Sequence, residues 1–189
     1  MKKYAMVFDA GTGAGRCNLF DMSGRLVSYA YREWEYLKDL SSSNKEAMLF
    51  DAEQFKKILF SLCRKVIKQA GISADEVVAV SATSQREGMV WLDRFGKEIY
   101  AAPSVDLRGE EATDILSGKE PFIKEITGLP VSGMFGLARL LWYKKFNEAV
   151  YDRIDTVMMI SDWICYLLCG SKVSEPSVAS SSQLFLSLI

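Results

Sequence analysis

A short apolar run leads into a glycine-rich loop near the start of the chain, and this pairing constrains the fold more than any other feature. Residues 4–8 are apolar and end at Asp9, and the loop at residues 11–15 reads GTGAG. The following stretch, residues 16–21, is too short for a helix before the turn formed by residues 21–24, which begins with Asp and ends with Gly. The sequence therefore predicts a strand, a loop and a second strand.

The spacing of this loop excludes two common phosphate-binding motifs. A P-loop needs GxxxxGK[ST], and no lysine follows this loop; a dinucleotide motif needs a third glycine opening a helix, where this chain has Arg16 and a predicted strand. What remains is a hairpin whose backbone N–H groups and Thr12 hydroxyl can contact anionic oxygens. Asp9 can hold Mg²⁺, usually through water. A plain glycine turn is the competing interpretation, and the residues leave both open.

The rest of the chain predicts a mixed α/β architecture. The clearest helix covers residues 51–70, where Asp51 is the N-cap and Gly71 ends the helix. Residues 76–84 predict a buried strand, and a second hairpin is expected around the Asp-x-x-Gly turn at Asp93. Further helices are expected at residues 108–116, 121–127, 134–146 and 162–169, and a strand at residues 156–160. We expect one domain whose sheet opens with antiparallel hairpins, without a linker.

Charge and histidine content narrow the function. The chain has 189 residues, 23 Lys+Arg against 24 Asp+Glu, and no histidine. Balanced charge gives no electrostatic basis for binding nucleic acid or an anionic membrane. The absence of histidine excludes a Ser-His-Asp triad and a histidine zinc site. Acid–base chemistry must therefore come from carboxylates, lysine, tyrosine or cysteine.

Cysteine usage and hydropathy indicate a soluble, cytoplasmic protein with reduced thiols. None of the four cysteines forms a CxxC pair, and Cys165 and Cys169, one helical turn apart, are expected to face a core. The longest apolar stretch, residues 156–170, is interrupted by Asp162 and is shorter than the ~20 residues of a membrane span. The N-terminal apolar run breaks at Asp9, too early for a signal peptide.

Four segments, arriving in order, resemble those of the FGGY carbohydrate kinases. DAGTG at residues 9–13, followed by Arg16, resembles the family's opening motif. SQREG at residues 84–88 resembles its Gln-Arg-Glu polyol-binding segment, and VDLR at residues 105–108 its (Asn/Val)-Asp-x-Arg segment. ISDW at residues 160–163 resembles its Asp-aromatic helix. The resemblance covers essentially the whole chain, and enzyme types acting on autoinducer-2, xylulose and glycerol look most similar, in that order.

The resemblance implies an actin-like (ribonuclease H-like) fold with a phosphate-binding hairpin. It also implies ATP and Mg²⁺, and transfer of the γ-phosphoryl group to a hydroxyl of a small sugar, polyol or autoinducer-2-like substrate. Residues 1–189 would form the N-terminal actin-like domain of such a kinase. The implied phosphate and magnesium site consists of Asp9 (holding Mg²⁺ through water), Gly11, Thr12 and Gly13. The implied substrate site consists of Gln85, Arg86, Glu87 and Asp106.

The residues by themselves allow simpler interpretations of three of these segments. Arg86 and Glu87 can donate to and accept from neighbouring hydroxyls, or form a surface ion pair. Asp106 and Arg108 can share a site, form a salt bridge with each other, or cap a helix. Asp162 fits the N-terminus of a helix beside the helix dipole. These alternatives stay open at this point.

The chain also departs from the family pattern. Members often carry a hydroxyl residue where Ala14 stands, and Gly15 predicts a looser loop. Residues 174–182 resemble a loop-and-strand segment that lines the family's sugar pocket, and residues 184–189 predict a strand that is cut short. FGGY kinases are well over twice as long, so their general base, second phosphate loop and adenine pocket are expected beyond Ile189.

Three functional hypotheses follow, the first two of different class. In the first, the chain is part of a longer kinase whose C-terminal nucleotide domain is missing here, and the chain alone is inactive. In the second, it is a non-catalytic fragment or a sugar-binding module. In the third, the chain is an unrelated actin-like ATPase. A nucleotide would then protect the fold against unfolding, whereas sugars would not. An exposed apolar domain face would invite self-association into a homodimer.

Overall fold

The computed structural model describes residues 3–185, and the chain divides into two compact units. Each unit is assembled from separate segments of the chain. Unit 1 comprises Met1–Glu35, Asp51–Gln85 and Ile160–Lys172, and unit 2 comprises Tyr36–Phe50, Arg86–Met159 and Val173–Ile189. The chain passes repeatedly from one unit to the other, and the last of these crossings, between Lys172 and Val173, lies in a serine-rich stretch.

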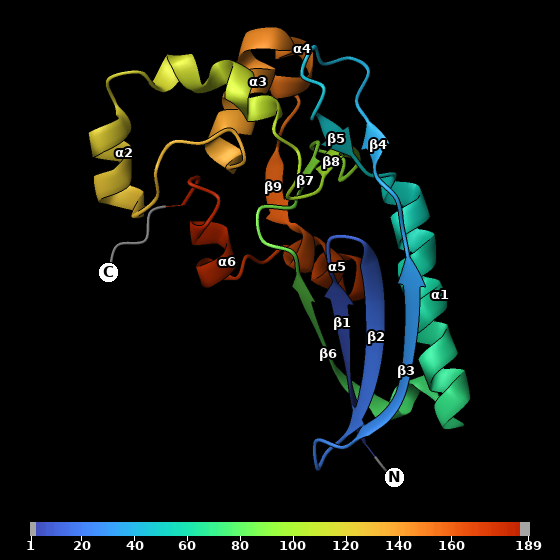
Figure 1. The fold of residues 1–189 in the computed structure, drawn as a ribbon. Helices are drawn as coiled ribbons and strands as arrows, with labels where there is room; N and C mark the ends of the chain where they lie inside the picture. The colour runs from blue at the N-terminus through green and yellow to red at the C-terminus, as the bar shows by residue number, and fades with distance from the viewer. Residues whose placement is uncertain (1–2, 186–189) are drawn as a thin grey trace. The chain divides into compact units, whose positions relative to one another are not determined.

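Unit 1 contains a mixed sheet with strand order β3-β2-β1-β6 (Figure 1). Its strands are β1 (Tyr4–Ala10), β2 (Ala14–Asp21), β3 (Leu26–Glu33) and β6 (Val77–Ser84). β1 pairs with β2 in antiparallel fashion and with β6 in parallel. The predicted strand–loop–strand opening and the mixed sheet are therefore confirmed.

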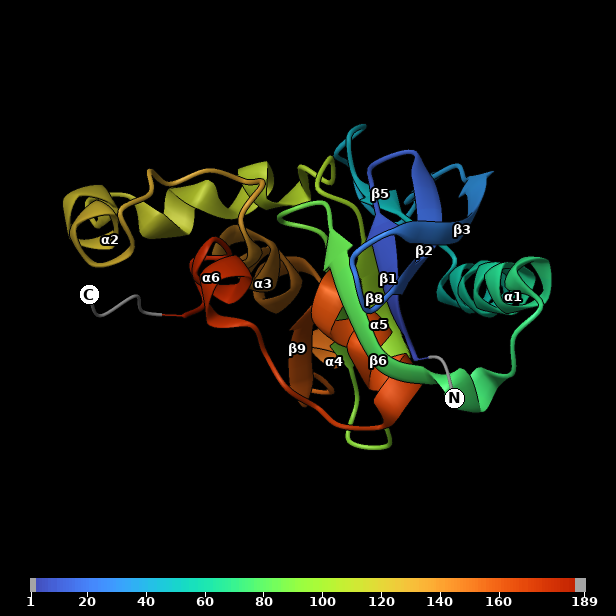
Figure 2. The same cartoon turned by 90° about the horizontal axis from the view of Figure 1, so that it is seen from below.

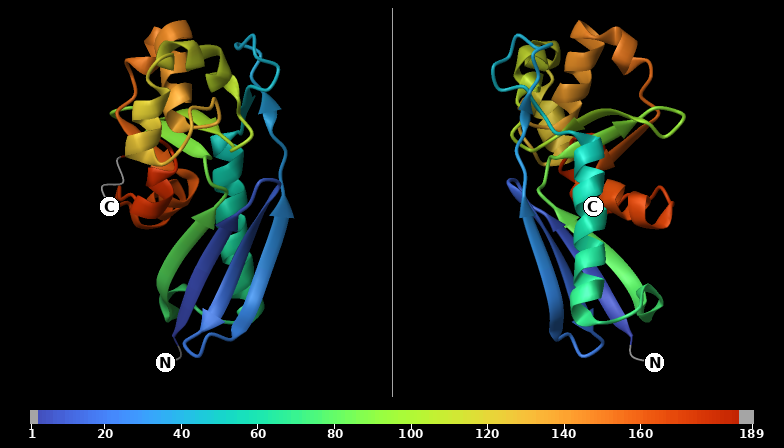
Figure 3. Two further views of the ribbon diagram at one scale, coloured as in Figure 1. Left: turned by 60° about the vertical axis from the view of Figure 1, so that its left-hand side comes forward. Right: turned by 90° about the vertical axis from the view of Figure 1, so that its right-hand side faces the viewer.

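The long helix α1 (Ala52–Ala70) packs along β2 and β3 (Figure 3). It begins as predicted, because the Asp51 side chain accepts a hydrogen bond from the Gln54 N–H at 3.0 Å. It ends at Gly71, whose φ of 64° is the left-handed conformation that glycine adopts without strain. Its buried face contributes Phe55 and Leu59 to the core of the unit, together with Phe8 of β1 and Trp163 of α5 (Ile160–Cys169).

The structure corrects two expectations about burial in unit 1. β6 was expected to be buried, but Val78 is 50% exposed and Val80 is 47% exposed, because β6 pairs only with β1 among the described strands and lies at the sheet edge. Cys169 was expected to face a core, but it is exposed, and Cys165 is half-buried. The buried cysteines are Cys17 and Cys63, whose sulfur atoms lie 3.9 Å apart.

Unit 2 contains an antiparallel sheet with strand order β8-β7-β9. Its strands are β7 (Met89–Leu92), β8 (Glu98–Ala102) and β9 (Thr156–Met159). The predicted hairpin is confirmed, and Asp93 closes its turn by accepting the Gly96 N–H at 2.8 Å. A short pair formed by β4 (Leu37–Lys38) and β5 (Met48–Leu49) accompanies this sheet.

Three helices of unit 2 lie at the expected positions, one of them as a 3₁₀ helix, and two further short helices, α4 (Glu148–Tyr151) and α6 (Pro176–Ser180), were not expected. The three expected helices are η2 (Arg108–Leu116), α2 (Glu120–Thr127) and α3 (Gly136–Phe146). η2 is a 3₁₀ helix, and α6 replaces the expected loop and strand at residues 174–182. α2 lies away from the β8-β7-β9 sheet (Figure 2). Leu184 and Phe185 are not in a strand, and the rest of the strand expected there falls outside the described residues.

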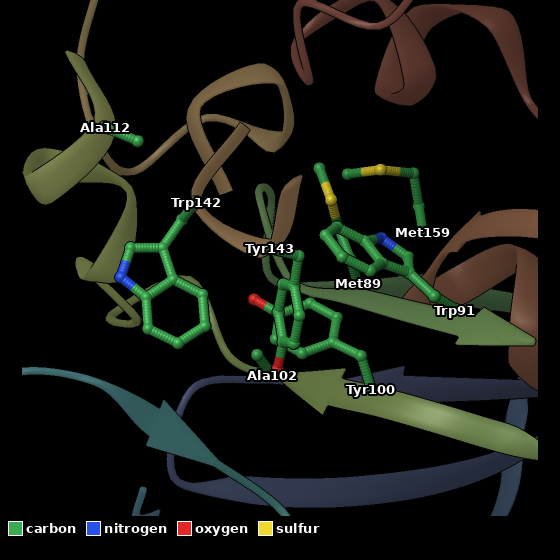
Figure 4. Packing of buried hydrophobic residues seen from close by; sticks show 8 residues of the cluster. All are labelled: Met89, Trp91, Tyr100, Ala102, Ala112, Trp142, Tyr143 and Met159. Atoms are coloured by element: carbon green, nitrogen blue, oxygen red, sulfur yellow. The ribbon is translucent and has the colours of Figure 1, made fainter. Parts of the chain in front are cut away.

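Aromatic rings and methionines fill the core of unit 2 (Figure 4). The Trp91 ring lies 4.2 Å from the Tyr100 ring and 5.4 Å from the Tyr143 ring, measured between centroids. Burying such large rings supplies much of the hydrophobic stabilisation of a small unit. Within the described part of the chain, no helix is both long and apolar enough to cross a membrane. The fold thus consists of two small α/β units, each with its own core.

Candidate functional site

The glycine-rich loop joins β1 to β2 and borders a pocket of about 430 Å³. The Gly11 N–H donates to the Ala14 carbonyl at 2.9 Å, which closes the turn. Asp9 and Arg16 lie opposite each other in the β1–β2 register. The pocket is lined by Asp9, Gly11, Gly13, Ala14, Gly15, Arg16, Tyr31 and Glu33. The pocket is therefore lined by the backbone of the loop glycines, by the positively charged Arg16 and by the Asp9 carboxylate.

The loop glycines provide close approach rather than unusual backbone angles. Gly11, Gly13 and Gly15 all lack a positive φ. A Cβ at Gly13 would have no atom within 4 Å, whereas a Cβ at Gly15 would lie 2.4 Å from the Trp34 ring. Trp34 also donates from its ring N–H to the Thr12 carbonyl at 3.3 Å and from its backbone N–H to the Gly13 carbonyl at 3.1 Å. The expectation that Gly15 loosens the loop was wrong, because Gly15 admits the ring that fastens it.

Gln85, which the sequence analysis assigned to the substrate site, lies beside this loop. Its backbone N–H donates to the Ala10 carbonyl at 2.8 Å, and its side-chain amide donates to the Gly11 carbonyl at 3.4 Å. The cause is the parallel pairing of β1 and β6, which brings the carboxyl ends of both strands to the same edge, where α/β folds commonly bind ligands. Unit 1 thus gathers Asp9, Thr12 and Gln85 at one edge of its sheet.

The residues at this edge fit magnesium held through water and phosphate rather than a protein cage. Asp9 is half-exposed on the pocket. Across residues 3–185, no three His, Cys, Asp or Glu side chains gather closely enough to hold a metal ion. Mg²⁺ is commonly bound by one or two carboxylates together with water and substrate phosphates. One carboxylate beside a loop able to receive phosphate meets that requirement.

Glu87, in unit 2, is the most unusual of the predicted site residues. The residue is 6% exposed, and its φ of 63° is left-handed, which costs a residue with a side chain about 1–3 kcal/mol. Its Oε2 atom is buried without a hydrogen-bond partner among the described residues. Burial raises the pKa of this carboxyl group, although Ser181, Arg139 and Arg86 counteract the rise. Because Glu87 is buried while Arg86 is exposed, the surface ion pair is not what the structure shows.

Asp106 and Arg108 form a buried ion pair, one of the alternatives that the sequence left open. The Arg108 Nε donates to Asp106 Oδ2 at 2.8 Å, and the Tyr100 hydroxyl donates to the same oxygen at 2.5 Å. The Met48 N–H donates to Asp106 Oδ1 at 3.1 Å. Arg108 also pairs with Asp39 at 2.8 Å. Asp106 is fully buried within this network.

The predicted site residues therefore fall into two groups. Asp9, the glycine loop and Gln85 belong to unit 1, whereas Arg86, Glu87 and Asp106 belong to unit 2. Asp162 is buried in the first turn of α5. The sequence reasoning missed Trp34 beside the loop, Arg139 beside Glu87 and the pocket residues Tyr31 and Glu33, and it named Arg16 in the motif without assigning it to the site. Hairpin register places Arg16 opposite Asp9 and would have assigned it to the site, but no local signal marks Trp34 or Arg139.

The fold is the actin-like (ribonuclease H-like) α/β fold of known sugar kinases. The chain superimposes on xylulose kinase from Rhodospirillum rubrum with a TM-score of 0.84 and 19% identity, covering 98% of this chain and 38% of that one. Glycerol kinase from Plasmodium falciparum with ADP gives a TM-score of 0.82 and 21% identity, also covering 98% and 38%. At these identities the similarity establishes the fold alone.

The chain belongs to the FGGY family of carbohydrate kinases. Residues 4–186 match the profile of that family's N-terminal domain. An autoinducer-2 kinase of Salmonella paratyphi B is 33% identical over 187 residues, which is 96% of this chain and 34% of that protein. An autoinducer-2 kinase of Escherichia coli O139:H28 is 33% identical over 192 residues, covering 97% and 35%. The chain thus spans about a third of the length of these relatives.

Proposed function

We propose that this chain is the N-terminal part of a kinase that transfers the γ-phosphoryl group of ATP to a hydroxyl of a small sugar, polyol or autoinducer-2-like molecule. Kinases of this family use ATP, and the relatives that are 33% identical act on autoinducer-2. The observation that carries the proposal is the juxtaposition of Asp9, the glycine loop and Gln85 at one sheet edge. The proposal includes a missing C-terminal nucleotide domain. It also includes a cytoplasmic location, which the four free cysteines support.

The phosphate-binding half of the proposed site needs few reactive groups. Phosphoryl transfer depends mainly on positioning and on neutralising charge, and Mg²⁺, when bound, supplies much of that neutralisation. Asp9 would hold the metal ion through water, and the backbone of Gly11, Thr12 and Gly13 would orient the phosphate oxygens. Arg16 lines the same pocket and adds positive charge. Trp34 keeps the loop in place through its hydrogen bonds to two loop carbonyls.

The residues proposed to bind the substrate are Gln85, the last residue of its segment of unit 1, and Arg86, Glu87 and Asp106 of unit 2. The Glu87 Oε2 atom is a buried acceptor without a partner among the described residues, so a substrate hydroxyl can donate to it. Arg86 is exposed and offers donors. Both Asp106 oxygens already accept from protein donors. We therefore propose that Asp106 orders the substrate segment, while Glu87 makes the direct hydroxyl contact.

The first test asks whether residues 1–189 act alone. No residue of the chain matches the family's general base, so we expect no ATP-dependent phosphorylation. The purified chain would be assayed with ATP, Mg²⁺ and, as separate probes, gluconate, xylulose, glycerol and autoinducer-2. Measurable turnover would contradict the proposed inactivity and would require a base within this chain.

The second test asks whether Glu87 contacts the substrate. Titration calorimetry with the same four probes would identify which of them the parent chain binds. Glu87→Ala is expected to weaken that binding by about 2 kcal/mol, roughly 30-fold, because it removes a charged acceptor. Glu125→Ala, an exposed glutamate in α2 of the same unit, is the matched control and should bind like the parent. Unchanged affinity in Glu87→Ala, with the melting temperature retained, would remove Glu87 from the site.

A sugar-binding module without catalysis is the second candidate. The buried, unpartnered oxygen of Glu87 favours it, since that feature serves binding without requiring phosphoryl transfer. Sugar binding by residues 1–189 that persists without ATP supports this candidate for the isolated chain. If ATP raises the melting temperature and none of the four probes does, an actin-like ATPase of another kind is the better description.

A further inference from the structure

Arg139 is a fully buried cation in α3 that no sequence motif had singled out. A buried guanidinium is costly unless its donors are satisfied. The Arg139 Nη1 donates to the Glu87 carbonyl at 2.8 Å, and Nη2 donates to the Ser104 carbonyl at 3.1 Å. Its Nε has no partner among the described residues. The Arg139 guanidinium therefore donates to two backbone carbonyls.

These carbonyls belong to the two segments of unit 2 that carry the proposed substrate residues. Glu87 closes the Gln-Arg-Glu segment, and Ser104 stands two residues before Asp106. Neither segment is helix or strand at these positions. The β7–β8 ladder ends at the pair Met89–Ala102, two residues short of Glu87 and Ser104, so no ladder hydrogen bond joins these two residues. The planar fork of Arg139 holds the carbonyls at a set spacing, which the single ammonium group of a lysine cannot reproduce.

The bond to Glu87 falls at the residue whose backbone most needs support. Glu87 has a left-handed φ of 63°, which residues with side chains seldom adopt unless their surroundings hold them. A donor on its carbonyl opposes rotation of the adjoining peptide. The same backbone conformation sets the direction of the Glu87 side chain, whose Oε2 atom is buried and without a partner in the described chain.

We propose that Arg139 is a positioning residue that locks Glu87 in its left-handed conformation and ties it to the Ser104 segment, so that the Glu87 carboxylate is presented to a substrate hydroxyl. This inference rests on the proposed function, because it gives Glu87 the role of hydroxyl acceptor. Arg139 itself would not contact the substrate, and it would act only through the two backbone carbonyls to which it donates.

The test uses residues 1–189 and two readouts. The first is the titration of the Glu87 carboxyl carbon, followed by NMR. The charged groups that act on this carboxyl are Arg139 and Arg86, with Ser181 as a polar neighbour. Arg139→Gln removes a cation, so the pKa of Glu87 should rise above its value in the parent, whereas Arg139→Lys should keep it near the parent value. Arg94→Gln, at an exposed turn of the same unit, is the control and should change nothing.

The second readout is calorimetric affinity for whichever of gluconate, xylulose, glycerol or autoinducer-2 the parent binds. Arg139→Gln and Arg139→Lys should both weaken binding at least tenfold, because neither restores the two-carbonyl fork. In a chain that already carries Glu87→Ala, Arg139→Gln should cause no further loss, since it acts through Glu87. An equal loss in both backgrounds, or parent affinity in Arg139→Lys, would overturn the proposal.

The two readouts separate this inference from the proposed function. If the parent binds none of the four probes, the proposed function fails, and the titration still decides whether Arg139 acts on Glu87. A Glu87 titration that is identical in Arg139→Gln and the parent would refute the inference whatever the chain binds. If Arg139→Gln does not fold, the affinity of Arg139→Lys alone decides the question.

Discussion

At the scale of single residues, Glu87 is the proposed site residue that combines the most unfavourable features. Glu87 combines a left-handed backbone, nine-tenths burial and an unpartnered oxygen, each of which is unfavourable for folding. Such features persist in a folded protein only where the surrounding structure enforces them. At Glu87 that enforcement comes in part from Arg139. The proposed binding role accounts for these unfavourable features of Glu87, whereas packing alone does not.

The raised pKa of Glu87 leads to a prediction about stability. Burial raises the folded pKa above its unfolded value, so the folded state binds this proton more tightly and loses stability as pH rises through the interval between the two values. Below the unfolded value both states are protonated and no cost arises. Glu87→Gln should therefore be more stable than the parent near pH 7, and the difference should shrink as pH falls towards about 4.

Urea unfolding of Glu87→Gln and the parent across this pH range measures the effect. Glu125→Gln, with an exposed side chain, controls for the loss of one negative charge. A stability difference that does not vary with pH would show that the Glu87 carboxyl titrates alike in the folded and unfolded chain.

Gly15 yields a second prediction at the residue scale. A Cβ there would approach the Trp34 ring to 2.4 Å and the Phe8 ring to 2.9 Å, and Trp34 is packed against Phe55 at 5.0 Å between centroids. Gly15→Ala should therefore destabilise the chain by about 1–3 kcal/mol through overpacking. Chemical denaturation followed by tryptophan fluorescence measures the change. Gly13→Ala is the matched control, since its new methyl group meets no atom within 4 Å.

At the scale of elements, local signals located most helices and strands. The Asp-x-x-Gly turns, the Asp51 cap and the Gly71 terminator depend on residues only a few positions apart, and all of them were predicted. The position of β6 along the chain was predicted correctly, but its burial was not. A run of valines marks a strand whether it lies in the centre of a sheet or at its edge, because neighbouring strands decide exposure.

The exposed edge of β6 predicts self-association of residues 1–189. Val78 and Val80 are about half exposed on a strand that pairs on one side only within the described chain, and such edges recruit further strands. Val80→Lys should reduce concentration-dependent association in analytical ultracentrifugation and change the folding free energy by under about 0.5 kcal/mol. Leu40→Lys, at a 93% exposed residue outside the strands, should leave association unchanged. A parent chain that stays monomeric at high concentration would contradict the prediction.

At the scale of the whole molecule, each unit is built from segments far apart in the sequence. In unit 2, Asp39 pairs with Arg108 at 2.8 Å, the Asn44 side chain donates to the Leu107 carbonyl at 2.9 Å, and the Phe50 N–H donates to the Ala101 carbonyl at 2.9 Å. The segment Tyr36–Phe50 therefore completes the network around the buried Arg108.

This arrangement predicts that the longest piece of unit 2, residues 86–159, does not fold alone. Without Asp39 it retains Arg108 as an incompletely paired buried cation, which typically costs about 3–5 kcal/mol. We expect no cooperative thermal transition by near-ultraviolet circular dichroism. Joining residues 36–50 to this piece through a flexible linker should restore part of the transition. A cooperative transition in residues 86–159 alone would show that the first segment is dispensable.

The sequence by itself determined the local elements, the order of the motifs and, through them, the family. It did not reveal that Arg139 holds Glu87, 52 residues away, or that Arg108 pairs with Asp39, 69 residues away. It also did not show the division into two units or the exposure of β6. Caps and turns are governed by neighbours along the chain, whereas burial and the pairing of buried charges depend on which distant segments meet, and only the tertiary structure decides that.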